Sequence, residues 1–225
     1  MVSHFEVPSE QGAPPEATTP GDATARNVND WADVDKRLRT WLDLLVTWNA
    51  KLDLTAARSE GELLDLMLAD AFALSRHCPH GASVVDVGSG AGAPGLPLAL
   101  IRPDLAVTLV EPLAKRVSFL RTVVGAVGRL DLRVHRGKAS DLVEAPTRWD
   151  IALSRATFSP AEWLLTARAL VRPPAESGLG GGSIWVLLAR EEAPTCDGVE
   201  LVDTVAYEWP NQGRARRAAR YVPVR

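Results

Sequence analysis

Apolar residues in the first third of the chain recur at steps of three and four residues. The series consists of Trp31, Val34, Leu38, Trp41, Leu42, Leu45 and Trp48. This spacing predicts a helix with one apolar face, and Asn29 or Asp30 would cap its first turn. We expect its tryptophans to pack in the core rather than to stack on nucleic-acid bases. A similar pattern predicts a second helix over residues 62–76.

Beyond residue 82 the pattern changes to short apolar runs that alternate with helical segments. Strands are predicted over residues 83–87, 106–111, 132–136, 149–154 and 183–189. The helices between them are predicted over residues 95–102, 114–127 and 160–171. This alternation indicates a Rossmann-like α/β fold, in which a mostly parallel sheet is covered on both faces. Two final strand-like segments, 199–209 and 219–225, have no helix between them and predict an antiparallel hairpin at the sheet edge.

Composition divides the chain into three parts. Residues 1–28 are rich in Pro, Glu, Thr and Ala but poor in large apolar residues, so we expect a disordered tail. Residues 29–78 form a predicted helical extension, and residues 79–225 form the predicted α/β domain. Within that domain the segment "PPAESGLGGGS" (173–183) is interpreted as a flexible loop before a strand, not as a phosphate cradle.

The most informative stretch is "VVDVGSGAGAPGLP" at residues 84–97, directly after a predicted buried strand. The loop after such a strand opens onto the crevice where α/β sheets bind ligands. Glycines at alternate positions would let the backbone approach a ligand closely, and the following helix would point free N–H groups toward it. The predicted cofactor-binding residues of this loop are Gly88, Ser89, Gly90, Gly92 and Ala93.

Two acidic residues narrow the choice of cofactor. The run fits the dinucleotide pattern G-x-G-x-x-A, yet Asp86 stands two residues before the first glycine, where it would repel a pyrophosphate. S-adenosyl-L-methionine has no phosphate and carries an ammonium and a sulfonium, which the same carboxylate would attract. Glu111, at the end of the next strand, can accept hydrogen bonds from both ribose hydroxyls of either cofactor. Asp86 therefore favours S-adenosyl-L-methionine over a dinucleotide or a turn that binds nothing.

Charge and composition limit the remaining possibilities. The net charge is −3, but residues 1–30 contribute −4, so the rest of the chain carries +1. No apolar run approaches the roughly 20 residues of a membrane span, and no signal-peptide pattern is present. Cys78 and Cys196 fit neither a zinc site nor a disulfide framework. We expect a cytoplasmic protein that acts as a monomer, with no bound metal and no membrane contact.

The carboxyl-terminal fifteen residues hold the clearest basic cluster. They contain no acid and five arginines: Arg214, Arg216, Arg217, Arg220 and Arg225. Such a cluster on a nearly neutral body can contact phosphate groups. It can equally be the solvated edge of a strand, and the sequence leaves both interpretations open.

Three longer segments are distinctive in combination. They are "WNAKLDLTAAR" (48–58), "VVDVGSGAGAPGLPLALIRPDLAVTLVEPLAKRVSFLR" (84–121) and "LSRATFS" (153–159). Together they resemble the RsmG (GidB) family of bacterial 16S ribosomal RNA guanine-N7 methyltransferases, over about residues 40 to 190. The resemblance implies a class I S-adenosyl-L-methionine-dependent methyltransferase that acts on small-subunit ribosomal RNA.

The resemblance also implies roles for individual residues. Arg155 would be the catalytic residue at the boundary between cofactor and acceptor, and Lys115 and Arg116 would contact the RNA. The cofactor pocket would include Gly88, Ala93, Glu111, Ala139, Ser140 and Arg155. Guanine N7 carries a lone pair and no proton, so methyl transfer needs no general base. Ordering of the two reactants can lower the barrier by roughly 7–11 kcal/mol.

The chain departs from the family pattern where the acceptor would bind. The segment "DLMLADA" (65–71) lacks the basic residue and the histidine that are usual there, and Asp53 replaces an asparagine. Leu188 and Ala189 stand in place of a Lys-Gly pair. Methylation of another RNA or of a small molecule, and a role in binding without catalysis, are therefore open alternatives.

Overall fold

The computed structural model describes residues 31–174 and 181–224. The predicted tail (1–28), the proposed helix caps Asn29 and Asp30, residues 175–180 of the glycine-rich loop, and Arg225 lie outside the described residues.

A seven-stranded mixed sheet forms the centre of the molecule, with the strand order β3-β2-β1-β4-β5-β7-β6. Strands β1 to β5 are parallel, whereas β7 runs antiparallel to both of its neighbours. The strands are Ser83–Val87 (β1), Ala106–Glu111 (β2), Arg133–Arg136 (β3), Ile151–Ser154 (β4), Ser183–Leu188 (β5), Val199–Trp209 (β6) and Arg214–Pro223 (β7). The order reverses between β1 and β4, which creates the switch point where sheets of this kind bind ligands.

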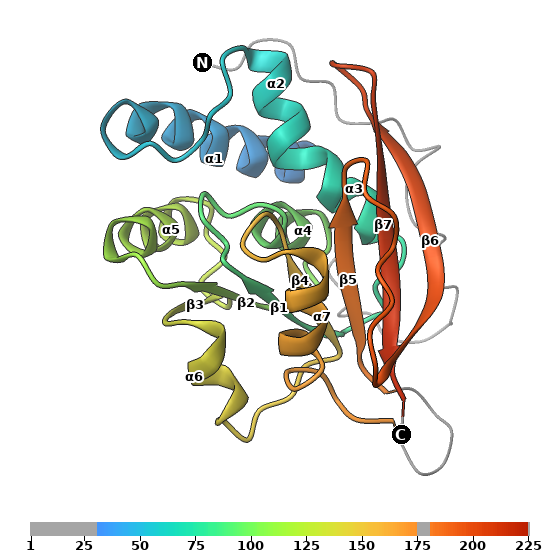
Figure 1. Cartoon of the computed structure of the whole chain (residues 1–225). Helices are drawn as coiled ribbons and strands as arrows, with labels where there is room; N and C mark the ends of the chain where they lie inside the picture. Colours follow the sequence, from blue (N-terminus) through green and yellow to red (C-terminus); the bar gives the residue numbers. More distant parts are fainter. Residues whose placement is uncertain (1–30, 175–180, 225) are drawn as a thin grey trace, which may run out of the picture.

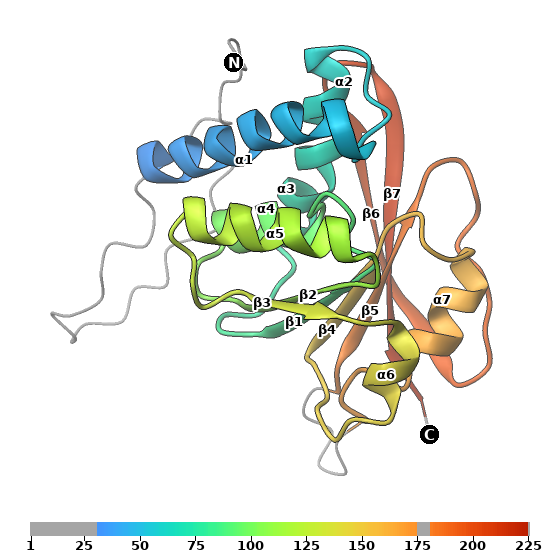
Figure 2. The same cartoon turned by 90° about the vertical axis from the view of Figure 1, so that its left-hand side faces the viewer.

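Helices cover both faces of the sheet (Figures 1 and 2). α4 and α5 pack on one face, with α1 and α3 packed onto them, and α6 and α7 lie on the other. The helices are Trp31–Leu52 (α1), Glu60–Leu64 (α2), Asp65–Ala69 (η2, a π-helical turn), Asp70–Ser75 (α3), Gly95–Ile101 (α4), Ala114–Ala126 (α5), Ala139–Val143 (α6) and Pro160–Ala167 (α7). The predicted Rossmann-like α/β fold is confirmed.

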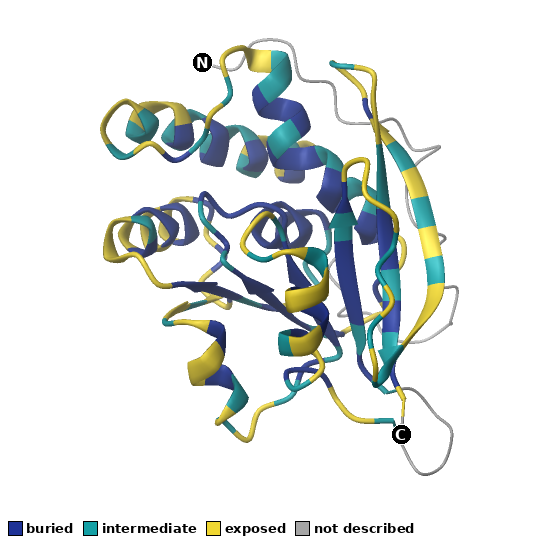
Figure 3. Ribbon diagram, in the orientation of Figure 1, coloured by how far each residue is buried: buried dark blue, intermediate teal, exposed yellow. Residues whose placement is uncertain are grey.

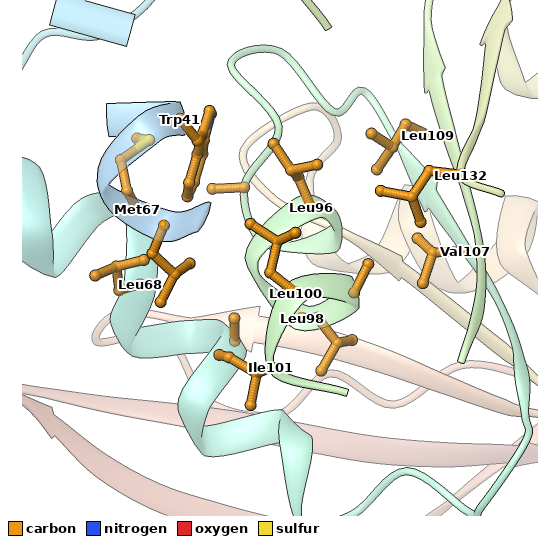
Figure 4. Packing of buried hydrophobic residues seen from close by; sticks show 14 of the residues in the cluster. Trp41, Met67, Leu68, Leu96, Leu98, Leu100, Ile101, Val107, Leu109 and Leu132 are labelled. Carbon is orange, nitrogen blue, oxygen red and sulfur yellow. The ribbon is translucent and has the colours of Figure 1, made fainter. Parts of the chain in front are cut away.

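Successive residues of the central strands contribute to two hydrophobic clusters, one on each face of the sheet. On β1, Val84 belongs to the cluster under α1, α4 and α5, whereas Val85 and Val87 belong to the cluster with α7. Figure 3 shows the central strands largely buried, whereas the edge strand β6 and the outer helix surfaces are more exposed. Figure 4 shows part of the first cluster, in which Trp41 of α1 and Leu100 of α4 lie among the apolar side chains. Burial on both faces explains why these strands appear in the sequence as unbroken apolar runs.

The first predicted helix is confirmed as α1. Trp41 is fully buried, and Trp31 and Trp48 are half-buried against the same cluster. The Trp48 ring lies 5.6 Å from the ring of Phe119 on α5, measured between centroids. The tryptophans therefore pack with the core, as the pattern indicated.

The second predicted helix, over about residues 62–76, is present but differs in two details. It begins at Glu60, because the Ser59 hydroxyl accepts a hydrogen bond from the Glu62 N–H at 3.2 Å and caps the first turn. It is also interrupted by the π-helical turn η2. Apolar periodicity predicts which face of a helix is buried. It does not predict a π-helical turn, which inserts one residue into the helix.

The predicted antiparallel hairpin at the sheet edge is confirmed, but its second strand is longer than predicted. β7 begins at Arg214 rather than at residue 219, and it lies inside the sheet between β5 and β6. The four described arginines of the basic cluster therefore lie on the strand next to the edge strand β6. The missed residues 214–218 are rich in arginine and alanine, which gives them no apolar alternation.

Candidate active site

Two loops meet at the switch point of the sheet. The glycine loop (residues 88–94) follows β1, and the 155–159 loop follows its neighbour β4. A Cβ added to Gly88 would lie 2.0 Å from the hydroxyl oxygen of Thr157, and the φ of Gly88 is +78°. Any larger residue at position 88 would therefore separate the two loops.

The glycine loop is fixed by hydrogen bonds to the ends of β1 and β2. The N–H groups of Gly88 and Ser89 donate to the carbonyl of Val110 at 2.8 and 3.0 Å. The Ser89 hydroxyl accepts from the Val110 N–H at 3.1 Å. Gly90 and Gly92 take left-handed φ values of 55° and 110°, which other residues adopt only with strain. These contacts give the loop a defined shape without a ligand.

Glu111 completes this frame at the carboxyl end of β2. Its Oε2 accepts a hydrogen bond from the Gly90 N–H at 3.0 Å, and its Oε1 accepts one from the Leu113 N–H at 2.9 Å. The side chain is buried. Each carboxylate oxygen can accept a second hydrogen bond, so Glu111 keeps acceptor positions beyond its two backbone contacts.

Asp86 lies under the glycine loop and is fully buried. Its Oδ2 accepts a hydrogen bond from the Gly95 N–H at 3.0 Å, whereas its Oδ1 has no partner among the described residues. Burial raises the pKa of Asp86 to about 7, although the Gly95 N–H and the charge of Arg155 oppose the rise. A buried carboxylate with an unpaired oxygen would be stabilised by a cation bound nearby.

A cavity of about 740 Å³ opens where β1 to β4 end. Three of the predicted cofactor residues, Gly88, Ala139 and Ser140, lie in its wall, together with Thr157 and Phe158. The others are not wall residues of this cavity: Asp86, Ser89, Gly90, Gly92, Ala93 and Glu111. They build the loop and strand ends beside it. The volume lies within the usual range for small-molecule sites.

Arg155 does not line this cavity. Its Nη1 donates to the carbonyl of Leu66 in η2 and lies 3.4 Å from the Asp70 carboxylate. Its charge also opposes the rise in the pKa of Asp86. Arg155 is thus held by η2 and by the first residue of α3.

Lys115 and Arg116, the predicted RNA contacts, occupy the first turn of α5 and point in different directions. Lys115 is exposed. Arg116 is half-buried, and its Nη1 lies 4.0 Å from the point where a Cβ on Gly90 would be. Arg116 therefore faces the glycine loop, whereas Lys115 is exposed to solvent.

Sequence reasoning did not identify Asp70, which contacts Arg155, or Tyr207 and Trp209, which donate hydrogen bonds to Asp70. The Asp70 carboxylate accepts hydrogen bonds from the Tyr207 hydroxyl at 2.8 Å and from Trp209 Nε1 at 3.4 Å. One signal was available, because Asp70 is an acid three residues after Met67, on the apolar side of its helix. An acid in such a position requires a partner, but the partners come from distant parts of the chain.

Within residues 31–174 and 181–224, no helix is long and apolar enough to cross a lipid bilayer. The same residues contain no group of three or more His, Cys, Asp or Glu side chains that could hold a metal ion.

Comparison with known proteins matches the sequence to a family. Residues 35–177 match the family described as rRNA small subunit methyltransferase G (GidB). The protein of that name from Anaeromyxobacter dehalogenans (strain 2CP-C) is 35% identical over 214 residues, which are 90% of each chain. Its namesake from Myxococcus xanthus (strain DK1622) is 32% identical over 87% of this chain and 91% of its own.

Solved structures support the same fold. The crystal structure of TrmN from Thermus thermophilus superposes with a TM-score of 0.51 at 25% identity, over 68% of this chain and 48% of that one. The fold is therefore the Rossmann-like one of class I methyltransferases. With the family match extending over more than half of its length, the chain belongs to the rRNA small subunit methyltransferase G family.

Proposed function

We propose that this protein transfers a methyl group from S-adenosyl-L-methionine to guanine N7 of 16S ribosomal RNA, as a monomer in the cytoplasm. The observation that carries the proposal is the glycine loop with Glu111 beside a cavity of about 740 Å³ in a chain of this family. The names of the relatives specify small-subunit ribosomal RNA as their substrate, and the N7 position is our own extension.

The residues at the cavity fit S-adenosyl-L-methionine. Glu111 has acceptor positions left for the two ribose hydroxyls, and the unpaired Oδ1 of Asp86 would favour a cationic ligand. Ala139 and Ser140 would form the wall beside the adenine, and Gly88 would allow close approach of the ligand to the backbone. When bound, this cofactor supplies an electrophilic methyl group on a sulfonium.

The residues of the site have little covalent chemistry to perform. Guanine N7 attacks with its lone pair and loses no proton, so the site needs no general base. The contribution of the protein is to hold the acceptor in line with the methyl group, which can account for roughly 7–11 kcal/mol of the barrier. Arg155 is the residue that we assign to this task, because a guanidinium can donate two hydrogen bonds to guanine O6 or to a carboxylate.

The test is methyl transfer to purified small-subunit RNA, naked and assembled into the ribosomal subunit. We expect a mass gain of one methyl group, mapped to N7 by cleavage at the modified guanine. Calorimetry with S-adenosylhomocysteine measures the cofactor half of the site separately. Cofactor binding without methylation of either RNA would refute the proposed acceptor, and a parallel incubation with total RNA and metabolite extracts would identify a different one.

A further inference from the structure

Asp70 joins three segments that are far apart in the sequence. It is the first residue of α3, directly after η2, and it is 3% exposed. Its Oδ1 accepts hydrogen bonds from Tyr207 and Trp209 on β6, at 2.8 and 3.4 Å. Its Oδ2 faces Nη1 of Arg155 at 3.4 Å. One buried carboxylate therefore connects a helix, the hairpin and the loop after β4.

The contacts of Asp70 are divided between its two oxygens. Burial, and then the charge of Asp70, raise the pKa of Tyr207 above its ordinary value, so the hydroxyl stays protonated and donates. With Oδ1 occupied by two neutral donors, Oδ2 is left for the guanidinium. A carboxylate removed from water is costly without a cationic partner, and Arg155 supplies that charge.

Two acceptors of the same helical segment contact Nη1 of Arg155. The Leu66 carbonyl of η2 accepts one hydrogen bond from Nη1, and Asp70 provides the opposite charge next to it. A planar guanidinium with two fixed acceptors loses most of its rotational freedom. Single π-helical turns often occur at functional sites, and here η2 presents the Leu66 carbonyl to this side chain.

We propose that Asp70 is a positioning residue that fixes the Arg155 guanidinium for methyl transfer, while Tyr207 and Trp209 fix Asp70. The inference rests on the proposed function, since it assigns Arg155 a part in that reaction. It adds a role for the β6–β7 hairpin, which holds the arginine through a single carboxylate.

Asp65 provides a matched control within the same segment. It is buried like Asp70, and its Oδ1 accepts hydrogen bonds from the backbone N–H and from Nδ2 of Asn211 at 3.1 and 2.9 Å. Asn211 belongs to the turn between β6 and β7. Asp65 thus also ties η2 to the hairpin, but its hydrogen bonds among the described residues go to Asn211 and not to Arg155.

The experiment compares Asp70→Asn with Asp65→Asn in the full chain. An asparagine oxygen can still accept from Tyr207 and Trp209, so Asp70→Asn removes mainly the charge opposite Arg155. We expect kcat for RNA methylation to fall by about 100-fold, the effect of a misplaced reacting group. The KM for RNA and the Kd for S-adenosylhomocysteine should stay near wild type. Asp65→Asn should keep the wild-type kcat, and thermal melting checks that both variants fold.

Two further measurements separate positioning from a structural role. In an Arg155→Ala background, Asp70→Asn should cause no additional loss of kcat, because its effect acts through the arginine. Tyr207→Phe, which spares both charges, should lower kcat in the same direction but by less. The proposal is overturned if the two asparagine variants lose activity equally, or if the loss persists without Arg155.

A readout without turnover distinguishes failure of this proposal from failure of the proposed function. NMR of the Arg155 side-chain N–H group should show an ordered guanidinium in the wild type and in Asp65→Asn, and a mobile one in Asp70→Asn. If wild-type protein methylates no RNA, the proposed function fails, while the NMR comparison still tests whether Asp70 orders the Arg155 guanidinium. Equal order in all three proteins would refute the positioning role.

Discussion

Glu111 fixes the glycine loop, and we propose that the same side chain binds the ribose of the cofactor. Its carboxylate accepts the Gly90 and Leu113 N–H groups, and it would accept the ribose hydroxyls through its remaining lone pairs. Replacement by glutamine keeps the size but turns one acceptor into a donor that faces an N–H group.

We therefore expect Glu111→Gln to weaken binding of S-adenosylhomocysteine by about 10- to 100-fold, since hydrogen bonds to charged groups contribute roughly 1.5–3 kcal/mol. Isothermal titration calorimetry measures the change in Kd. Glu200→Gln on β6 is a suitable control, because that glutamate is exposed on the edge strand. An unchanged Kd in Glu111→Gln would mean that the ribose does not bind there.

Asp86 predicts a dependence of stability on pH. Burial raises its pKa from 3.8 to about 7 in the folded protein, so the folded state binds the proton more tightly than the unfolded chain. This contribution to the free energy of unfolding is present in full below the unfolded pKa and is lost as the pH rises through about 7.

Asp86→Asn removes that dependence while its amide oxygen can still accept the Gly95 N–H. Relative to wild type, the ligand-free variant should gain stability between pH 4 and pH 8, as measured by urea unfolding at several pH values. A wild-type protein whose unfolding free energy differs from that of the variant by a constant amount over this range would contradict the assignment of the shift to Asp86.

At the scale of elements, α1 is attached to the site through one tryptophan. Trp41 is fully buried, and its Nε1 donates to the carbonyl of Ala91 in the glycine loop at 3.0 Å. The helix therefore stabilises the loop as well as covering α4 and α5.

Trp41→Phe should lower the free energy of unfolding by about 1–3 kcal/mol, because the Ala91 carbonyl loses its partner in the interior. It should also weaken S-adenosylhomocysteine binding, since the loop loses an anchor. Trp48→Phe is the matched control on the same helix, because Trp48 packs on Phe119 instead of the glycine loop. Equal losses of affinity in the two variants, measured by calorimetry, would show that α1 affects the site only through general stability.

Across the whole molecule, the elements that could be predicted from the sequence are those whose residue pattern is local. The strands β1 and β2 match their predicted bounds, because burial on both faces makes each an apolar run that ends at a turn. Asp86, the glycine loop and Glu111 could be predicted for the same reason, as they follow directly from strand ends. The arrangement around Arg155 could not, because Asp70 and Tyr207 are 137 residues apart and only the folded sheet brings them together.

The position of β7 in the sheet leads to a prediction about the RNA-binding surface. β7 is antiparallel to β5, so its first residue, Arg214, lies at the same end of the sheet as the carboxyl ends of the parallel strands and the cavity. Arg133 opens the parallel strand β3 and lies at the opposite end. Both side chains are exposed, and the two arginines lie at opposite ends of the strands.

If RNA binds at the end of the sheet where the cavity opens, Arg214→Ala should weaken RNA binding at low salt. It should also reduce the slope of log K against log salt concentration by about 0.7–0.9, the value for one lost phosphate contact. Arg133→Ala should leave the slope unchanged. Filter binding of a fragment of small-subunit RNA at a series of salt concentrations measures both. A change in slope for Arg133→Ala with none for Arg214→Ala would place the RNA at the opposite ends of the parallel strands, away from the glycine loop, and would contradict the prediction.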